Sequence, residues 1–267
     1  MIAYLLAVLS SIAYGSADFC GGLATKRSGK LFGVVVLSQL TGLILLLPFL
    51  SGTPHKIDLA WGAGAGIAGG LGVALLYRAL STGVMSVIAP VTAVCAAIVP
   101  LIVGIFLGER PKVAALIGVA MAIVAIVLVS QSGEAYASTG LVTAVASGII
   151  IGFFLVCLAR SGPSAGLWPL LAARVVSVTF FAMFVRGLPP RASLPLVIGG
   201  GALDMLANVL YVVAVRGGML SIVATLTSLY PASTIILARI VLKERLRTLQ
   251  QIGVLCAAGA IVLIVSA

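Results

Sequence analysis

The chain has very few charged side chains for its length. Of its 267 residues, 16 are Lys or Arg and six are Asp or Glu, and there is a single histidine. A soluble domain carries roughly a quarter charged residues. Here hydrophobic residues reach 62% and the mean hydropathy is +1.29. The chain therefore lacks the polar surface that a water-soluble globule needs, which excludes soluble and disordered classes.

The sequence also has little with which to build a catalytic or metal site. Its cysteines all lie within apolar runs without a CxxC pair, and these are Cys20, Cys95, Cys157 and Cys256. Such cysteines are typical of small buried hydrophobes. No cluster with metal-ligand spacing is present, and we expect neither a metal nor another cofactor.

Two short motifs resemble enzyme signatures, but their context argues against both. Residues 162–166 match the nucleophile elbow, which requires a strand before it and a histidine partner. The only histidine is His55, in a distant loop. Residues 64–69 match the dinucleotide fingerprint inside an apolar helix, without a preceding strand. We prefer to interpret Gly62, Gly66 and Gly70 as a small-residue face for close helix packing. The sequence predicts that the protein is not an enzyme.

The formal net charge is +10, which in a soluble protein would suggest nucleic acid. The bases instead separate long apolar runs, as they do in membrane proteins, so no nucleic-acid partner is expected. A membrane helix needs about 20 apolar residues. Ten runs approach that length: 3–24, 31–50, 59–80, 83–107, 113–130, 140–159, 167–185, 194–215, 219–242 and 249–266. We predict an all-α membrane protein with ten transmembrane helices and both termini on one side.

An internal repeat appears when the chain is compared with itself at an offset of 135 residues. Between positions 79 and 128, 18 of 50 residues are identical to those 135 further on. The matches include Glu109-Arg110 with Glu244-Arg245, each at a predicted helix boundary. The repeat predicts two units, 1–130 and 131–267. Because each unit has five helices, the second must cross the membrane in the opposite sense, and such inverted repeats are typical of transporters.

The text of the repeat resembles a known family. The run LYRALSTGVMSVIAPVTAV with its LGERP ending, and the run from SLYPAS to LKERLRTLQQIGVL, are similar to the EamA family of the drug/metabolite transporter superfamily. The resemblance covers the whole chain, although Lys243 replaces the glycine that the first copy has at position 108. It implies a secondary transporter, often an exporter of amino acids or related metabolites.

The resemblance also implies a multi-pass protein of the cell membrane with both termini in the cytoplasm. Loop charges argue the other way, because five Lys or Arg residues would then face the cytoplasm and nine the outside, against the positive-inside rule. We retain the implied cytoplasmic termini as an expectation. The lipid bilayer and a small-molecule substrate are the expected partners, with a proton gradient or the solute gradient as energy source and a monomer or homodimer as assembly.

Ionisable residues inside a membrane span cost several kcal/mol and are commonly functional. Arg174 and Asp204 lie at similar depth on adjacent antiparallel helices, about 18 Å from their connecting loop. We predict an ion pair, which either fixes helix packing or lines a substrate cavity. Asp204, Asn208 and Tyr211 share one helix face at i, i+4 and i+7, and this face should point inward.

Further candidates lie in other spans. Asp18 follows Tyr14 by one turn, and it either pairs with the bases at positions 26 and 27 or serves as a cavity carboxylate and coupling site. Tyr77 and Tyr230 need hydrogen-bond partners within a helix and are candidate solute contacts. Pro90, Pro100 and Pro231 interrupt their spans as kinks or hinges.

These features together predict an alternating-access transporter that exports an amino acid or a related small metabolite. The expected solute contacts are Tyr14, Asp18, Tyr77, Arg174, Asp204, Asn208, Tyr211 and Tyr230. One alternative is an exporter of hydrophobic cations, and another is a membrane receptor or scaffold that transports nothing.

Overall fold

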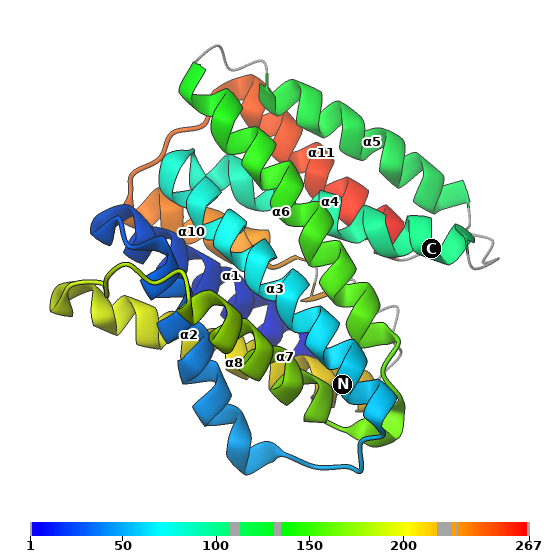
Figure 1. Cartoon of the computed structure of the whole chain (residues 1–267). Coiled ribbons are helices and arrows are strands. Elements are labelled where there is room, and N and C mark those ends of the chain that lie inside the picture. Colours follow the sequence, from blue (N-terminus) through cyan, green and yellow to red (C-terminus); the bar gives the residue numbers. More distant parts are fainter. Residues whose placement is uncertain (1, 107–112, 131–134, 218–225, 228, 266–267) are drawn as a thin grey trace.

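The computed structural model describes residues 2–106, 113–130, 135–217, 226–227 and 229–265. Within these residues the chain is helical and has no strand (Figure 1). The α-helices are α1 (Ile2–Ser28), α2 (Leu31–Leu46), α3 (Lys56–Thr82), α4 (Met85–Phe106), α5 (Val113–Ser130), α6 (Ala135–Ala159), α7 (Trp168–Ala182), α8 (Leu194–Gly217), α10 (Pro231–Val241) and α11 (Thr248–Val265). Three single 3-10 turns also occur: η1 (Leu47–Phe49), η2 (Pro163–Ala165) and η3 (Arg191–Ser193).

Six helical segments in this part of the chain are long and apolar enough to cross a membrane. They correspond to α1, α2 with η1, α3, α4, α6 and α8 with η3. The apolar stretches of α5, α7, α10 and α11 are shorter. The structure thus confirms an all-helical, multi-span chain, while the count of ten spans remains a prediction.

The predicted span 219–242 is not one straight helix in the structure. Residues 218–225 and 228 lie outside the described part, and α10 starts only at Pro231. Just before it, the backbone N–H groups of Leu229 and Tyr230 donate to carbonyls three residues back. Proline has no N–H and suits the first position of a helix. By contrast, Pro90 and Pro100 lie inside α4, which continues through both.

Helix α1 lies at the centre of the arrangement (Figure 1). It packs against α8 along its length and also contacts α2, α3 and α10. Helix α3 packs on α6 and α7, and α5 pairs with α11. The labelled N- and C-terminal ends lie at the same end of the bundle (Figure 1). We call this the terminal end, and the opposite one, with the α1–α2 and α3–α4 turns, the turn end.

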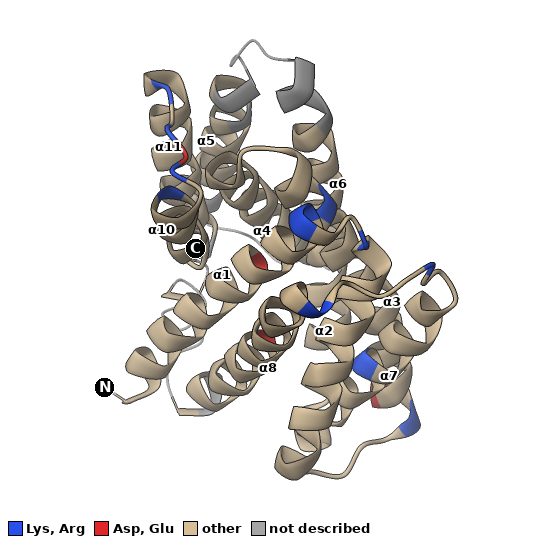
Figure 2. Ribbon diagram, turned by 90° about the vertical axis from the view of Figure 1, so that its left-hand side faces the viewer, with Lys and Arg blue, Asp and Glu red and all other residues tan. Residues whose placement is uncertain are grey.

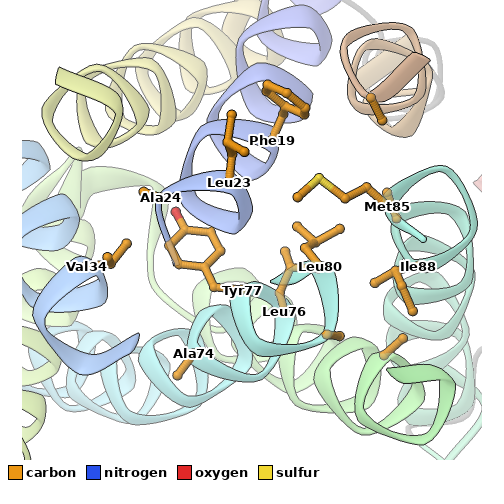
Figure 3. Packing of buried hydrophobic residues seen from close by; sticks show 14 of the residues in the cluster. Phe19, Leu23, Ala24, Val34, Ala74, Leu76, Tyr77, Leu80, Met85 and Ile88 are labelled. Atoms are coloured by element: carbon orange, nitrogen blue, oxygen red, sulfur yellow. The ribbon is translucent and has the colours of Figure 1, made fainter. Parts of the chain in front are cut away.

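The largest buried apolar cluster joins α1, α2, α3 and α4. Phe19 and Leu23 of α1 face Leu80 of α3 and Met85 of α4, with the ring of Tyr77 pointing toward α1 (Figure 3). All five are at most 4% exposed. Because these residues lie in the last turns of α1 and α3 and the first turn of α4, the cluster fills the bundle near its turn end.

Several contacts recur at the offset of 135 residues found in the sequence. The Ser10 hydroxyl of α1 donates to the carbonyl of Ala207 in α8, at 2.8 Å. The Ser147 hydroxyl of α6 donates to the carbonyl of Gly72 in α3, also at 2.8 Å. Positions 72 and 207 are 135 apart. The offset likewise relates α1 to α6 and α3 to α8, so the two helix pairs are pinned in equivalent ways.

Other residues contact their own counterparts directly. Gln39 of α2 and Arg174 of α7 are 135 residues apart, and their side chains share a hydrogen bond. Between α5 and α11, Ala122 and Ala125 belong to one buried cluster with their counterparts Ala257 and Ala260. A residue meets its own counterpart only close to a symmetry axis. An approximate two-fold axis passing through both contacts would account for them.

Candidate functional site

A glycine face on α3 brings α7 close. A methyl group added at Gly62, Gly66 or Gly70 would overlap with α7, and at Gly66 it would meet the backbone of Ala173. This confirms the small-residue packing face expected from the sequence. The close approach fixes the position of α7 and of Arg174, the residue after Ala173.

Arg174 joins three helices through its guanidinium group. It forms the predicted ion pair with Asp204 of α8 and donates a second hydrogen bond to the side-chain oxygen of Gln39 in α2. Its side chain is 9% exposed and that of Asp204 is 24% exposed. A buried charge is tolerated when it is paired and hydrogen-bonded. This ion pair is therefore the polar link that holds α2, α7 and α8 together.

Gln39 was not among the predicted site residues. Its sequence signal was a lone amide within an apolar run, 135 residues before Arg174. The offset had been used to find the repeat, but it also identifies residues that can meet at the symmetry axis. A search for polar residues at equivalent positions would have found this contact.

The predicted polar face of α8 lies along α1. Asn208 is buried and donates to the backbone carbonyl of Asp204 within its own helix. Tyr211 packs with Tyr4 of α1 near the terminal end. Of the three residues, Asp204 alone has the ion pair with α7. The face points inward, as the sequence predicts, and each member meets a different neighbour.

Tyr14 and Tyr230 come together where α1 crosses the break before α10. Their ring centroids are 6.3 Å apart with planes tilted by 60°. The crossing is close because a methyl group at Gly15 would overlap with the Tyr230 carbonyl. The Thr234 hydroxyl of α10 donates to the Gly15 carbonyl at 2.9 Å. The interrupted backbone thus lies directly against the middle of α1.

Asp18 lies one turn beyond this crossing and differs from Asp204. It forms no hydrogen bond and no ion pair within the described residues, although Lys26 and Arg27 are among them. Its side chain is partly exposed, and its charge is near enough to interact with that of Asp204. The predicted alternative in which Asp18 pairs with the nearby bases is therefore not realised in this structure.

Tyr77 is in a different environment from the other tyrosines. It is 3% exposed, and its ring lies over Gly21 of α1, where a methyl group would overlap with it. Its hydroxyl shares a hydrogen bond with the Ser38 side chain of α2. The polar partner that the sequence argument required is present, but the residue is packed among α1, α2 and α3. A direct solute contact by Tyr77 stays a prediction.

Glu244 makes a contact that the sequence analysis did not anticipate. Its carboxylate accepts hydrogen bonds from the backbone N–H groups of Met85 and Ser86 and from the Ser86 hydroxyl, at 2.8–3.0 Å. A carboxylate at a helix N-terminus satisfies free N–H groups and complements the helix dipole. The loop before α11 therefore caps α4 at the turn end. The matching Glu109-Arg110 pair lies outside the described residues.

The middle of the bundle thus combines an unpaired carboxylate, a neutralised ion pair and two tyrosines. Tyr14 is within electrostatic range of Asp18, Asp204 and Arg174. Asp18 offers a negative charge and the tyrosine hydroxyls can donate or accept hydrogen bonds. Such a group of side chains can bind a small amphiphilic solute that carries a positive charge.

Comparisons with known proteins agree with this architecture. The model of the EamA-like transporter family matches residues 1–131 and again residues 135–266. No curated protein matches the chain. A solved structure titled "Crystal structure of protein" is 17% identical, covers 98% of this chain and 96% of its own, and superposes with a TM-score of 0.61. At that identity the likeness concerns the fold alone.

Proposed function

We propose that this chain, which belongs to the EamA-like transporter family, exports an amino acid or a related small metabolite by alternating access. It is a multi-pass membrane transporter. The proposal adds a cargo, a direction and a mechanism, with the cell membrane as its location. The observation that carries it is the interrupted helix before α10, which lies against Tyr14 and next to the unpaired Asp18. Solute sites in transporters are commonly built at such discontinuous helices near the bilayer midplane.

The equivalent contacts of the two halves support an inverted repeat. Ser10 and Ser147 bond carbonyls 135 residues apart, and Gln39 meets its counterpart Arg174. An inverted repeat lets each half adopt the conformation of the other, which exchanges the closed end of the bundle. On this proposal the two five-helix units, 1–130 and 131–267, are the moving parts.

The closed end would be the turn end. There α1 packs against α3 through Gly21 and Tyr77, and Glu244 caps α4. The counterparts α6 and α8 have no comparably extensive contact within their described parts. The proposed transport step breaks the α1–α3 contact and the Glu244 cap, and forms the equivalent contacts at the terminal end.

The proposed solute contacts are Tyr14, Asp18, Tyr230 and the α8 face of Asp204, Asn208 and Tyr211. Asp18 would hold an ammonium group or carry a coupling proton. Arg174 and Tyr77 would act behind them, because the charge of Arg174 is taken up by Asp204 and Gln39.

A cationic cargo is a second candidate, favoured by one specific observation. Asp18 is unpaired, whereas Arg174, the basic side chain in the middle of the described bundle, is already neutralised. A carboxylate-bearing solute would lack a free cation here, but an amine would not. A hydrophobic cation is therefore the alternative substrate.

Counterflow in proteoliposomes tests the proposal and separates the two cargoes. The probes are a set of labelled amino acids, each with its decarboxylated amine. Exchange of an amino acid, lost in Asp18→Asn but kept in Phe153→Leu, would support the main proposal. The control Phe153 occupies the position equivalent to Asp18 in the second half and is exposed. Exchange of amines alone would favour the cation exporter, and no exchange of any probe, with intact folded protein, would contradict both. Efflux from preloaded cells then gives the direction.

A further inference from the structure

Exposed basic side chains are gathered at the turn end of the bundle. Ten Lys or Arg side chains lie in its turns or within about one helical turn of them, and all ten are exposed: Lys26, Arg27, Lys30, Arg78, Arg186, Arg191, Arg239, Lys243, Arg245 and Arg247. They come from four separate connections of the fold. Figure 2, which views the molecule from that side, shows Lys and Arg in several turns and few acidic residues.

The terminal end carries fewer bases. In the described part these are Lys56 and Arg160, and the guanidinium of Arg160 lies 5.7 Å from the ring centre of Trp61. The sequence adds Arg110, Lys112 and Arg216, whose side chains are outside the described part. Together they make five, against ten at the turn end.

Acidic residues do not offset this difference. The described carboxylate at the turn end is Glu244, and it is occupied by the N-terminus of α4. At the terminal end, Asp58 is similarly occupied, because it accepts hydrogen bonds from the backbone N–H groups of His55 and Gly162. The excess of bases at the turn end is therefore presented to whatever borders that end.

We infer that the turn end contacts the anionic phospholipid head groups of the cytoplasmic leaflet, and that both termini lie on the opposite side of the membrane. Lys and Arg near a span end are attracted to anionic head groups and are retained on the cytoplasmic side during insertion. Their ten-to-five distribution is the charge complementarity that identifies the partner. This orientation reverses the one implied by the family resemblance and does not depend on which solute is transported.

Two exposed positions offer a matched pair for the test. Ala192 lies at the turn end beside Arg191, and Thr53 lies at the terminal end in the connection before α3. Neither side chain takes part in the site described above. Ala192→Cys and Thr53→Cys would each be expressed in the full chain in a bacterial host, with the unsubstituted chain as background for the four native cysteines.

Spheroplasts are then treated with a membrane-impermeant maleimide, before and after lysis. The inference expects Thr53→Cys to react in intact spheroplasts and Ala192→Cys to react only after lysis. The reverse pattern would overturn it, and so would equal labelling of both positions before lysis. An alkaline phosphatase fused after Ala267, which is active only outside the cytoplasm, should be active. A fluorescent, cytoplasmically folded reporter at the same place would contradict the inference.

Charge variants test the lipid contact itself. Removing the three bases of the α10–α11 connection (Lys243→Gln, Arg245→Gln and Arg247→Gln together) should make Ala192→Cys reactive in a fraction of intact spheroplasts. Lys56→Gln at the terminal end should leave the pattern unchanged. If neither variant alters the labelling, the wild-type pattern still decides the orientation, but the role of these bases in setting it is refuted. In binding to vesicles of phosphatidylcholine with and without phosphatidylglycerol, turn-end peptides are avoided and the whole detergent-solubilised protein is used; a preference for the anionic vesicles that is lost in the triple variant supports the contact, and equal binding contradicts it.

Discussion

The two halves of the molecule differ most where their first and third helices meet. In the first half, α1 and α3 pack closely because Gly21 and Gly22 of α1 leave room for Tyr77 and Leu80 of α3. At the equivalent positions in the second half, α6 has Val156 and Cys157. Without the glycine pair, the described parts of α6 and α8 have no comparable contact. Close packing of membrane helices depends on small residues at the contact, so a two-residue difference separates a closed end from an open one.

The centre of the bundle shows a second difference between the halves. Gln39 and Arg174 occupy equivalent positions, but only the second half places a charge there and supplies Asp204 to neutralise it. The position equivalent to Asp204 in the first half is Gly69. Substitutions at these positions therefore break or sharpen the comparison.

The largest effect is expected from breaking the ion pair. Asp204→Asn leaves the Arg174 guanidinium buried with Gln39 as its remaining side-chain partner, and breaking a buried pair costs about 3–5 kcal/mol. We expect a large fall in the melting temperature of the purified protein. Arg174→Gln combined with Asp204→Gly would copy the first half and should recover much of the loss. A double variant as unstable as Asp204→Asn would show that the charge itself is needed.

Gly66→Ala should come next in magnitude. The added methyl overlaps with the backbone of Ala173 and pushes α7 away from α3, and overpacking costs about 1–3 kcal/mol. The control is Gly64→Ala on the same helix, because a methyl there meets only the Cys157 sulfur, at 3.8 Å. Thermal unfolding of both variants checks the difference, and equal melting temperatures would contradict the packing argument.

Gly21→Ala tests the closure of the turn end directly. The methyl overlaps with the Tyr77 ring, and we expect α1 and α3 to separate at a cost of about 1–3 kcal/mol. Cys20 is the neighbouring residue and is only partly exposed, so its reaction with a thiol reagent, followed by peptide mass spectrometry, reports the opening. It should react faster in Gly21→Ala than in the parent. Val156→Ala at the equivalent position should leave this rate unchanged, and an equal acceleration there would remove the proposed asymmetry.

The smallest effect is expected at the cap of α4. Ser86→Ala removes one of the hydrogen bonds to Glu244 but leaves the backbone donors of Met85 and Ser86. Loss of a capping interaction costs about 1 kcal/mol. We expect a small decrease in melting temperature and a modest rise in Cys20 reactivity. A larger effect from Ser86→Ala than from Glu244→Gln would show that the serine has another role.

Much of the fold could be predicted from local patterns, but the site only in part. Apolar runs set the helices, and the Arg174–Asp204 pair followed from equal depth on adjacent antiparallel helices. Gln39 and Glu244 were missed because their partners are distant in sequence. Asp18 was left between two interpretations, since pairing with bases two turns away depends on side-chain direction. The helix break at Tyr230 was expected only as a kink, because proline in α4 is accommodated without one.

By itself the sequence determined the membrane environment, the helical class and the duplication, since these depend on hydropathy and on residue identity at a fixed spacing. Only the tertiary structure decided which counterparts meet, which carboxylate is neutralised and which end is packed shut. Those outcomes depend on how closely two helices approach, and a single methyl group at a glycine such as Gly21 or Gly66 is enough to change that distance.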